Sequence, residues 1–316
     1  MTKSISIEKL KSQMRLPVIA APMFLVSGPE LVIATCEAGV VGSFPSANAR
    51  TAAEFEAWLL RIEAALGAAR QEGVAVAPYA VNLIVQGALA PRFVEDLALV
   101  ERFKPPIVIT SVGQPGEVAK LVHAYGGLVF HDVATLRHAT KAAEQGVDGL
   151  ILLTAGAGGH TGIANPFAFV PQVRRQFGGA ILLAGAISDG RSILAAQTLG
   201  ADFAYMGTRF AATQESLAPA AYRELLVSQK MADVIITDRI SGMSATFLRG
   251  SISHAGLDPD HLPPTAGFLQ PTIPEAVKAW RDVWSGGHGV GSIDDIPSAA
   301  TLVDRLEAEY KAAAKP

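Results

Sequence analysis

Residues 180–210 read AILLAGAISDGRSILAAQTLGADFAYMGTRF and contain two apolar runs on either side of a segment with helical spacing. The runs at 180–184 and 203–206 are short and almost wholly apolar, which predicts buried strands. The segment 190–199 is followed by Gly200, and glycine commonly terminates helices. This order of strand, helix and strand is typical of a βαβ unit, whose two strands run parallel.

The same alternation runs through most of the chain and predicts eight strands. Longer segments with helical spacing separate the apolar runs. Eight strand–helix units can close on themselves as a barrel, whereas a doubly wound sheet usually has fewer strands. The sequence therefore predicts an α/β fold, a (β/α)8 TIM barrel. The predicted strands span residues 17–21, 40–44, 76–83, 107–110, 128–130, 149–153, 180–184 and 203–206.

The alternation stops after the eighth predicted strand, where a small inserted domain is expected. The segment 237–264 is rich in Ser, Gly, Asp, His and Pro and lacks clean periodicity. Helical spacing is present on both sides of it, at 218–231, 273–284 and 297–313. The predicted division assigns residues 1–214 and 270–316 to the barrel and residues 215–269 to an inserted substrate or lid domain.

The composition favours a compact protein and argues against nucleic acid as a partner. Hydrophobic residues make up 50% of the 316 residues, charged residues make up 17%, and the net charge is −3. Because no long block of like charge is present, the chain has no electrostatic footprint for a polyanion. The single cysteine, Cys36, excludes an intramolecular disulfide and a cysteine-based metal cluster.

The N-terminal residues and the apolar runs suggest a cytoplasmic protein. Residues 1–14 lack the apolar core of a secretory signal. Apolar runs elsewhere fall well short of the ~20 residues that cross a membrane. We therefore expect no membrane partner.

Two glycine-containing loops predict a phosphate site. In a TIM barrel, the loops after strands seven and eight commonly bind phosphate through backbone N–H groups. The candidate donors here are Gly185, Ala186, Gly207 and Thr208. Glycine lets the backbone approach an anion closely. The same glycines could serve only to make tight turns, but their occurrence in both expected loops favours phosphate.

The loop after strand six predicts a shelf for a flat aromatic cofactor. Residues 154–162 read TAGAGGHTG, with GxGxxxG spacing that differs from a dinucleotide fingerprint, and the next strand lacks the expected terminal acidic residue. His160 ends the glycine-lined part of this loop. Histidine exchanges protons near neutral pH, so His160 is the best acid/base candidate. No HxH or HExxH pair supports a metal site.

With these motifs in place, the chain resembles the nitronate monooxygenase (2-nitropropane dioxygenase-like) family, related to FMN-dependent NADH:quinone reductases and enoyl-acyl-carrier-protein reductase II. The resemblance covers nearly the whole chain. Its most specific segments are APM at 21–23, AGGHTG at 157–162, DGR at 189–191, LGAD at 199–202, MGTRF at 206–210 and WSGG at 284–287.

The resemblance implies that FMN lies at the barrel mouth, with its phosphate at the loops after strands seven and eight. It implies that His160 is the catalytic histidine. Two positions depart from the family pattern, because Asp132 replaces a common lysine and His288 replaces a common glutamine. The additional residues expected at the cofactor are Ala21, Pro22, Met23, Asn82, Gly158, Gly159, Trp284 and Ser285.

Three functions follow as hypotheses. The first is a monooxygenase that uses FMN and O2 to convert alkyl nitronates, such as propionate 3-nitronate, to a carbonyl compound and nitrite. The second is an FMN-dependent NAD(P)H:quinone reductase or enoyl-thioester reductase. The third is a flavin-binding barrel without turnover. A small-molecule nitronate or nitroalkane and O2 are the expected partners of the first, and the sequence leaves a homodimer open.

Overall fold

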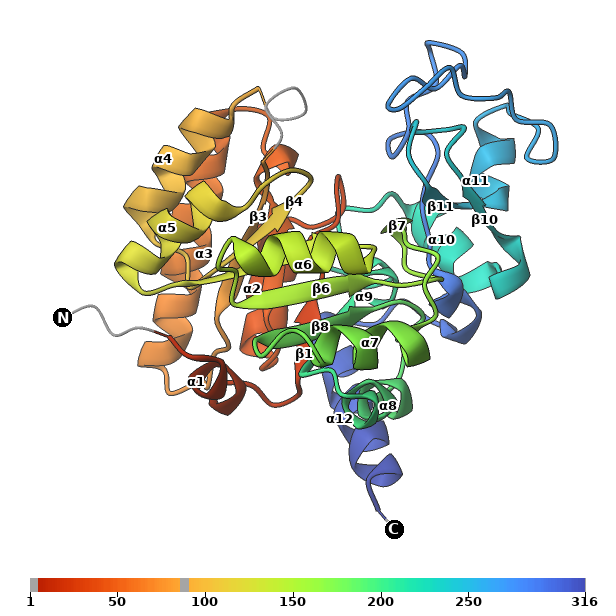
Figure 1. Cartoon of the computed structure of the whole chain (residues 1–316). Coiled ribbons are helices and arrows are strands. Elements are labelled where there is room, and N and C mark those ends of the chain that lie inside the picture. The colour runs from red at the N-terminus through yellow and green to blue at the C-terminus, as the bar shows by residue number, and fades with distance from the viewer. Residues whose placement is uncertain (1–4, 86–90, 316) are drawn as a thin grey trace.

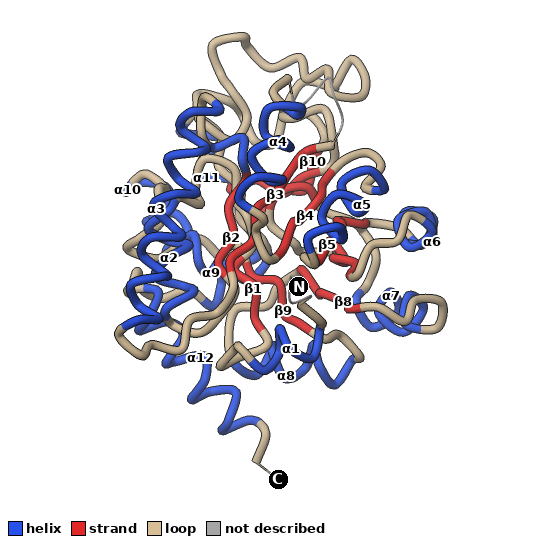
Figure 2. The backbone as a smooth tube through the Cα atoms, turned by 90° about the vertical axis from the view of Figure 1, so that its left-hand side faces the viewer, coloured by secondary structure: helices blue, strands red, loops and turns tan. Residues whose placement is uncertain are grey.

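The computed structural model describes residues 5–85 and 91–315. Eight parallel strands form one sheet in the order β1-β9-β8-β6-β5-β4-β3-β2. The two edges of this sheet meet where Ile19 pairs in parallel with Val41. Figure 2 shows the helices around the outside of the ring of strands. The predicted TIM barrel is confirmed. Its strands are β1 Val18–Ala20, β2 Gly42–Pro45, β3 Tyr79–Ile84, β4 Ile107–Ser111, β5 Leu128–Val133, β6 Gly149–Leu153, β8 Ala180–Ala184 and β9 Phe203–Met206.

The helices that follow the strands begin at recognisable caps. The Asn165 side chain accepts a hydrogen bond from the amide of Phe167, and Asp189 forms a capping box with Ser192. The helices are α1 Ile7–Ser12, α2 Pro29–Glu37, α3 Ala52–Gln71, α4 Phe93–Phe103, α5 Gly116–Tyr125, α6 Leu136–Glu144, α7 Pro166–Arg174, α8 Gly190–Leu199, α9 Thr208–Ala211, α10 Ala220–Ser228, α11 Arg249–His254 and α12 Ala299–Ala313. Short 3-10 turns lie at η1 Ser46–Asn48, η3 Met231–Asp233 and η4 His288–Ser292.

Side chains alternate between the inside and the outside of the barrel, as the strand period requires. In β6, Leu150 and Leu152 pack against the helices, whereas Ile151 belongs to the apolar cluster inside the barrel. Leu10 of α1 is fully buried in the same inner cluster. Because the amide of Ile5 donates to a carbonyl just before β5, α1 closes the barrel at the ends where the strands begin. The opposite end is therefore the one that can hold a ligand.

The segment after β9 builds a second, small sheet together with a barrel loop. Strands β10 Val234–Thr237, β11 Ala245–Leu248 and β7 Gly159–His160 form it in the order β10-β11-β7. Figure 1 shows this segment, in blue and cyan, projecting from one side of the barrel. The 215–269 boundary of the inserted domain stays a prediction. The apolar cluster of this segment also includes Val283, which favours an end beyond residue 269.

Residues 273–284 do not form the helix that their spacing predicts. The amide of Lys278 donates to the side chain of Asp282 at 2.8 Å instead of continuing a helical ladder. Trp280 then has a φ of 70°, in the left-handed region, and its amide donates to the carbonyl of Val283. That prediction was wrong because a local side chain captured an amide that a helix would need.

The other two helices predicted in the C-terminal third are confirmed. Residues 218–231 contain α10, and residues 297–313 contain α12. Among the helices in residues 5–85 and 91–315, none combines the length and the apolar character that crossing a bilayer requires.

Candidate active site

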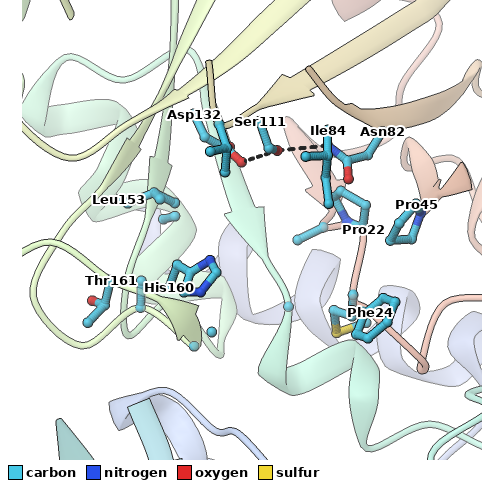
Figure 3. A pocket seen from close by; sticks show the side chains of 18 of the residues that line it. Pro22, Phe24, Pro45, Asn82, Ile84, Ser111, Asp132, Leu153, His160 and Thr161 are labelled. Carbon is cyan, nitrogen blue, oxygen red and sulfur yellow. Dashed lines mark hydrogen bonds between the residues drawn. The ribbon is translucent and has the colours of Figure 1, made fainter. Parts of the chain in front are cut away.

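A cavity of ≈ 1140 Å³ lies at the end of the barrel where the strands lead into loops. Figure 3 shows His160 and Thr161 on one side of it and Pro22, Phe24 and Pro45 on the other. All predicted site residues except Trp284 line this one cavity: Ala21, Pro22, Met23, Asn82, Gly158, Gly159, His160, Gly185, Ala186, Gly207, Thr208 and Ser285. The predicted contacts of these residues with a cofactor stay predictions.

One side of the cavity, here called the glycine wall, consists of Gly158, Gly159, Gly185, Ala186, Gly207 and Thr208. A Cβ on Gly158 would lie 2.9 Å from the hydroxyl of Thr208 and 3.2 Å from the amide of Gly287. A Cβ on Gly185 would collide with the hydroxyl of Thr154. Glycine is therefore required at these two positions so that the loops after β6, β8 and β9 can approach one another.

At Ala186 and Gly207, packing within the protein does not explain the backbone conformation or the choice of residue, which favours a role in ligand binding. Ala186 has a φ of 54°, and such strain in a residue other than glycine often marks a ligand-binding segment. A Cβ on Gly207 would come no closer than 3.6 Å to Met23, an ordinary contact. Packing within the protein does not force glycine at 207. The backbone there faces the cavity without a side chain.

His160 is held at the edge of the cavity by β7, which pairs with β11 so that His160 lies opposite Ala245. Its ring meets the ring of Trp280 edge to face, with centroids 5.2 Å apart. Burial lowers the pKa of His160, which favours the neutral imidazole. Within the part of the chain that the structure describes, neither ring nitrogen has a hydrogen-bond partner. The imidazole is therefore available to a ligand.

Ser285 ties the glycine-rich loop to the inserted segment. Its hydroxyl accepts a hydrogen bond from the amide of Gly159 at 2.7 Å and donates to the carbonyl of Thr246 at 2.6 Å. Thr208 makes a similar link, because its hydroxyl accepts from the amide of Gly287 at 3.0 Å. Although Ser285 lines the cavity, its hydroxyl proton is used within the protein, which indicates a positioning role.

Trp284 is not among the described residues that line the cavity, and its predicted contact with the cofactor stays a prediction. Its ring stacks on Tyr222, with centroids 5.3 Å apart, and its indole N–H donates to the carbonyl of Arg281. Tyr222 does line the cavity, and its hydroxyl donates to the carbonyl of Ser285. Trp284 therefore packs against Tyr222, which itself lines the cavity.

The bottom of the cavity, here called the polar floor, consists of Asn82, Ser111 and Asp132, which lie in the carboxyl-terminal halves of β3, β4 and β5. The Asn82 amide nitrogen donates to the Ser111 hydroxyl at 2.8 Å, and that hydroxyl donates to Asp132 Oδ2 at 2.6 Å. Figure 3 shows this hydrogen-bonded row. Burial raises the pKa of Asp132 to about 6, against the opposing effect of the Ser111 hydrogen bond. Its carboxyl group therefore titrates close to neutral pH.

Sequence reasoning did not select Ser111 or Trp280 for this site. For Ser111 the available signal was its position directly after the predicted strand 107–110, at the end of the barrel that holds the site. Trp280 lies 120 positions after His160 and reaches it only through the fold of residues 273–284. No local pattern marks it.

No metal centre is evident in residues 5–85 and 91–315, where no group of three or more His, Cys, Asp or Glu side chains is placed to hold an ion. The site instead combines closely approaching backbone segments with the imidazole of His160 and the carboxyl group of Asp132. The fold and this site at the carboxyl ends of the strands define the chain as a TIM-barrel enzyme.

The chain belongs to the nitronate monooxygenase family, whose model matches residues 6–309. The predicted membership of an oxidoreductase family that uses flavin is thereby confirmed at the level of the family. A protein named nitronate monooxygenase from Paraburkholderia phytofirmans is 29% identical, over 93% of this chain and 92% of its own length. A solved structure of nitroalkane oxidase from Streptomyces ansochromogenes has a TM-score of 0.79 at 25% identity, covering 96% of this chain and 98% of that one.

Another relative carries a different name. The (3aS,4S,5R,7aS)-5-hydroxy-7a-methyl-1-oxo-octahydro-1H-indene-4-carboxyl-CoA dehydrogenase from Rhodococcus jostii is 29% identical over 76% of this chain. The matched region spans 65% of that relative, slightly less than two thirds of its length. The names of these relatives thus specify different substrates, and the substrate of this chain has to be argued from its own site.

Proposed function

We propose that the protein is an FMN-dependent nitronate monooxygenase that oxidises alkyl nitronates with O2 to a carbonyl compound and nitrite. The observation that carries the proposal is the convergence of the glycine wall and the free imidazole of His160 on one cavity. Propionate 3-nitronate is the substrate we propose to test first. A cytoplasmic location and a homodimer stay predictions.

The glycine wall supports FMN as the cofactor. Gly185, Ala186, Gly207 and Thr208 come from the two loops that commonly bind phosphate in TIM barrels, and all four line the cavity. One such site suits the single phosphate of FMN, and the sequence has no adenine-binding fingerprint beside it. When bound, FMN would supply the redox chemistry by which electrons pass from the nitronate to O2.

His160 is proposed to handle the proton of the substrate. A neutral nitroalkane must lose a proton from carbon, and the neutral imidazole favoured by burial can accept it. For a preformed nitronate, the same imidazole would only hydrogen-bond the nitro oxygens. The edge-to-face contact with Trp280 covers part of the His160 ring and limits its rotation.

The test begins with the purified protein and the cofactor that it releases. We expect mass spectrometry to identify FMN, and we expect O2 uptake with nitrite release when propionate 3-nitronate is added. Recovery of FAD, or no flavin after reconstitution, would contradict the proposed cofactor site.

A second measurement separates oxidase from reductase. Under anaerobic conditions, a nitronate should bleach the flavin quickly and NADH should not. Rapid bleaching by NADH, with electron transfer to a quinone or an enoyl thioester, would favour the reductase alternative. Failure of both to bleach the flavin would favour a binding protein without turnover.

A further inference from the structure

The polar floor spans two successive levels of positions at the end of the barrel where the strands lead into loops, because Asn82 pairs with Ile109 and Ser111 lies two residues further along β4. Ile109 and Phe130, two residues before Ser111 and Asp132 on the same strands, belong to the apolar cluster inside the barrel and are fully buried. Because side chains alternate along a strand, Ser111 and Asp132 face the same interior one layer higher. This layer forms the boundary between the apolar core and the cavity.

The hydrogen bonds of the polar floor have a fixed direction. The amide nitrogen of Asn82 donates to the carbonyl of Ile109 at 3.1 Å as well as to Ser111. Since a carbonyl oxygen can only accept, this contact fixes which end of the Asn82 amide faces the strand. The Ser111 hydroxyl accepts from Asn82 and donates to Asp132. Asp132 is thus oriented through Oδ2, and Oδ1 is left over.

Asp132 Oδ1 is buried and lacks a hydrogen-bond partner among the described residues. Asp132 also forms no salt bridge within 5–85 and 91–315. A buried acceptor without a partner is costly, so this oxygen is set up to respond to whatever occupies the cavity. An ionised carboxylate there acts on a ligand with its charge scarcely screened by solvent.

The other titratable groups around the polar floor do not neutralise Asp132. Tyr205 on β9 stays protonated, because burial and the charge of Asp132 raise the pKa of its hydroxyl. Burial lowers the pKa of His131, the neighbour on β5, to about 4, and its Nδ1 contacts Thr110 at 2.8 Å. His138 and Lys141 on α6 line the cavity with exposed side chains. Asp132 is therefore the charged group of the floor.

We propose that Asp132, oriented by Asn82 and Ser111, makes the cavity bind oxidised flavin in preference to reduced flavin. The proposal rests on the proposed function, in that the cofactor is FMN. The oxidised ring is neutral, whereas the two-electron reduced ring readily loses a proton and becomes an anion that the carboxylate repels. The phosphate candidates follow β8 and β9, whereas the polar floor lies in the carboxyl-terminal halves of β3, β4 and β5, so the repulsion acts on the ring and spares the phosphate.

The preference should depend on pH. Because the pKa of Asp132 is raised to about 6, the carboxyl group is mostly neutral at pH 5 and mostly charged at pH 8. Repulsion of reduced flavin is therefore expected at pH 8 and not at pH 5. The Ser111 hydrogen bond opposes the rise of this pKa, so Ser111 acts as a positioning residue.

The test compares dissociation constants of oxidised FMN and of FMN reduced with dithionite under anaerobic conditions. Both are measured at pH 5 and pH 8 for the wild type, Asp132→Asn and Glu37→Gln. Asparagine keeps an acceptor for Ser111, and Glu37 is an exposed carboxylate at the end of α2, outside the cavity lining. At pH 8 the ratio of reduced to oxidised Kd should be about tenfold higher in the wild type than in Asp132→Asn.

At pH 5 these two ratios should agree within about twofold, and Glu37→Gln should match the wild type at both pH values. The inference would be overturned if the wild type and Asp132→Asn had equal ratios at pH 8. It would also be overturned if their ratios differed by the same factor at pH 5 and at pH 8. A wild-type protein that binds no oxidised FMN would overturn the proposed cofactor itself. Intact FMN binding with unchanged ratios would remove only the role of Asp132.

Ser111→Ala tests the positioning role separately. Without the Ser111 hydroxyl, the pH at which the ratio changes should move upward, because a hydrogen bond that lowers the pKa of Asp132 is lost. An unchanged midpoint would show that Ser111 does not orient or tune Asp132. Circular dichroism of each variant checks that the barrel is folded.

Discussion

The glycine wall presents backbone to the cavity, whereas the polar floor presents side chains from three neighbouring strands. In the glycine wall, Gly158 and Gly185 are required because a Cβ would collide with nearby groups. In the polar floor, Asn82, Ser111 and Asp132 are joined in a directed row of hydrogen bonds. The comparison teaches that the two sides of one cavity are built differently, one from backbone that approaches closely and one from side chains that include a titratable carboxyl group.

The largest expected effect is the loss of FMN binding when Gly207 of the glycine wall is replaced by aspartate. Gly207→Asp should weaken FMN binding about 100-fold or more, since like charges about 4 Å apart at an effective dielectric constant of about 20 repel by about 4 kcal/mol. Gly207→Ala is the matched control, because a Cβ there makes only ordinary contacts with Met23 and Ala21. The measurement is the FMN content after purification. Full flavin content in a folded Gly207→Asp variant would place the phosphate elsewhere.

The next effect concerns His160, which directly follows Gly159 of the glycine wall. His160→Asn should lower kcat/KM for neutral nitroalkanes by about 10²–10⁴, the usual contribution of a general base. For preformed nitronates the loss should be smaller, about 1–3 kcal/mol, because only a hydrogen bond and some positioning disappear. Steady-state O2 uptake with FMN content matched between proteins measures both. Equal losses on the two substrate forms would argue against proton abstraction.

The pH profile of the same reaction gives an independent check of His160. Burial lowers the pKa of His160 below its ordinary value of 6.5, and only the neutral imidazole can accept a proton. The value of kcat/KM, calculated for the neutral nitroalkane, should therefore stay level down to pH 6.5 and decline below it. A decline that begins well above pH 6.5 would point to another base.

A smaller effect is expected for the polar floor, where Asp132 should make the stability of the protein depend on pH. The pKa of Asp132 is about 6 in the folded protein against an ordinary 3.8, so its contribution to stability is complete below pH 3.8 and is lost as the pH rises through 6. That difference corresponds to about 3 kcal/mol. The unfolding free energy of cofactor-free Asp132→Asn should therefore exceed that of the wild type by up to this amount at pH 8 and by almost nothing at pH 4. Urea unfolding at the two pH values measures it, and an equal gain at both would contradict the assignment.

The smallest expected effect is at Ser285, which links the glycine wall to the inserted segment. Ser285→Ala removes the acceptor for the Gly159 amide and the donor to the Thr246 carbonyl. We expect a loss of about 1–3 kcal/mol in unfolding free energy. Exposed Ser228→Ala serves as the control. Thermal unfolding that does not distinguish the two variants would rule out the positioning role.

The sequence predicted the barrel because its signals are local. Apolar runs such as 149–153 and 180–184 correspond to β6 and β8 within the same bounds. The predicted helix at 273–284 was wrong, since helical spacing does not reveal that Asp282 captures the amide of Lys278. Spacing reports which residues can be buried together, but competing side-chain hydrogen bonds decide the local backbone.

In the candidate site, too, the sequence predicted some residues and only the structure revealed others. Sequence alone selected the phosphate candidates of the glycine wall and His160, because glycine lets backbone approach an anion and because His160 is a titratable side chain in a loop after a predicted strand. Only the tertiary structure brought Trp280 to His160 and placed Ser111 between Asn82 and Asp132. Those contacts depend on strand register and on a chain reversal far along the sequence. Such long-range geometry leaves no periodic pattern in the residues themselves.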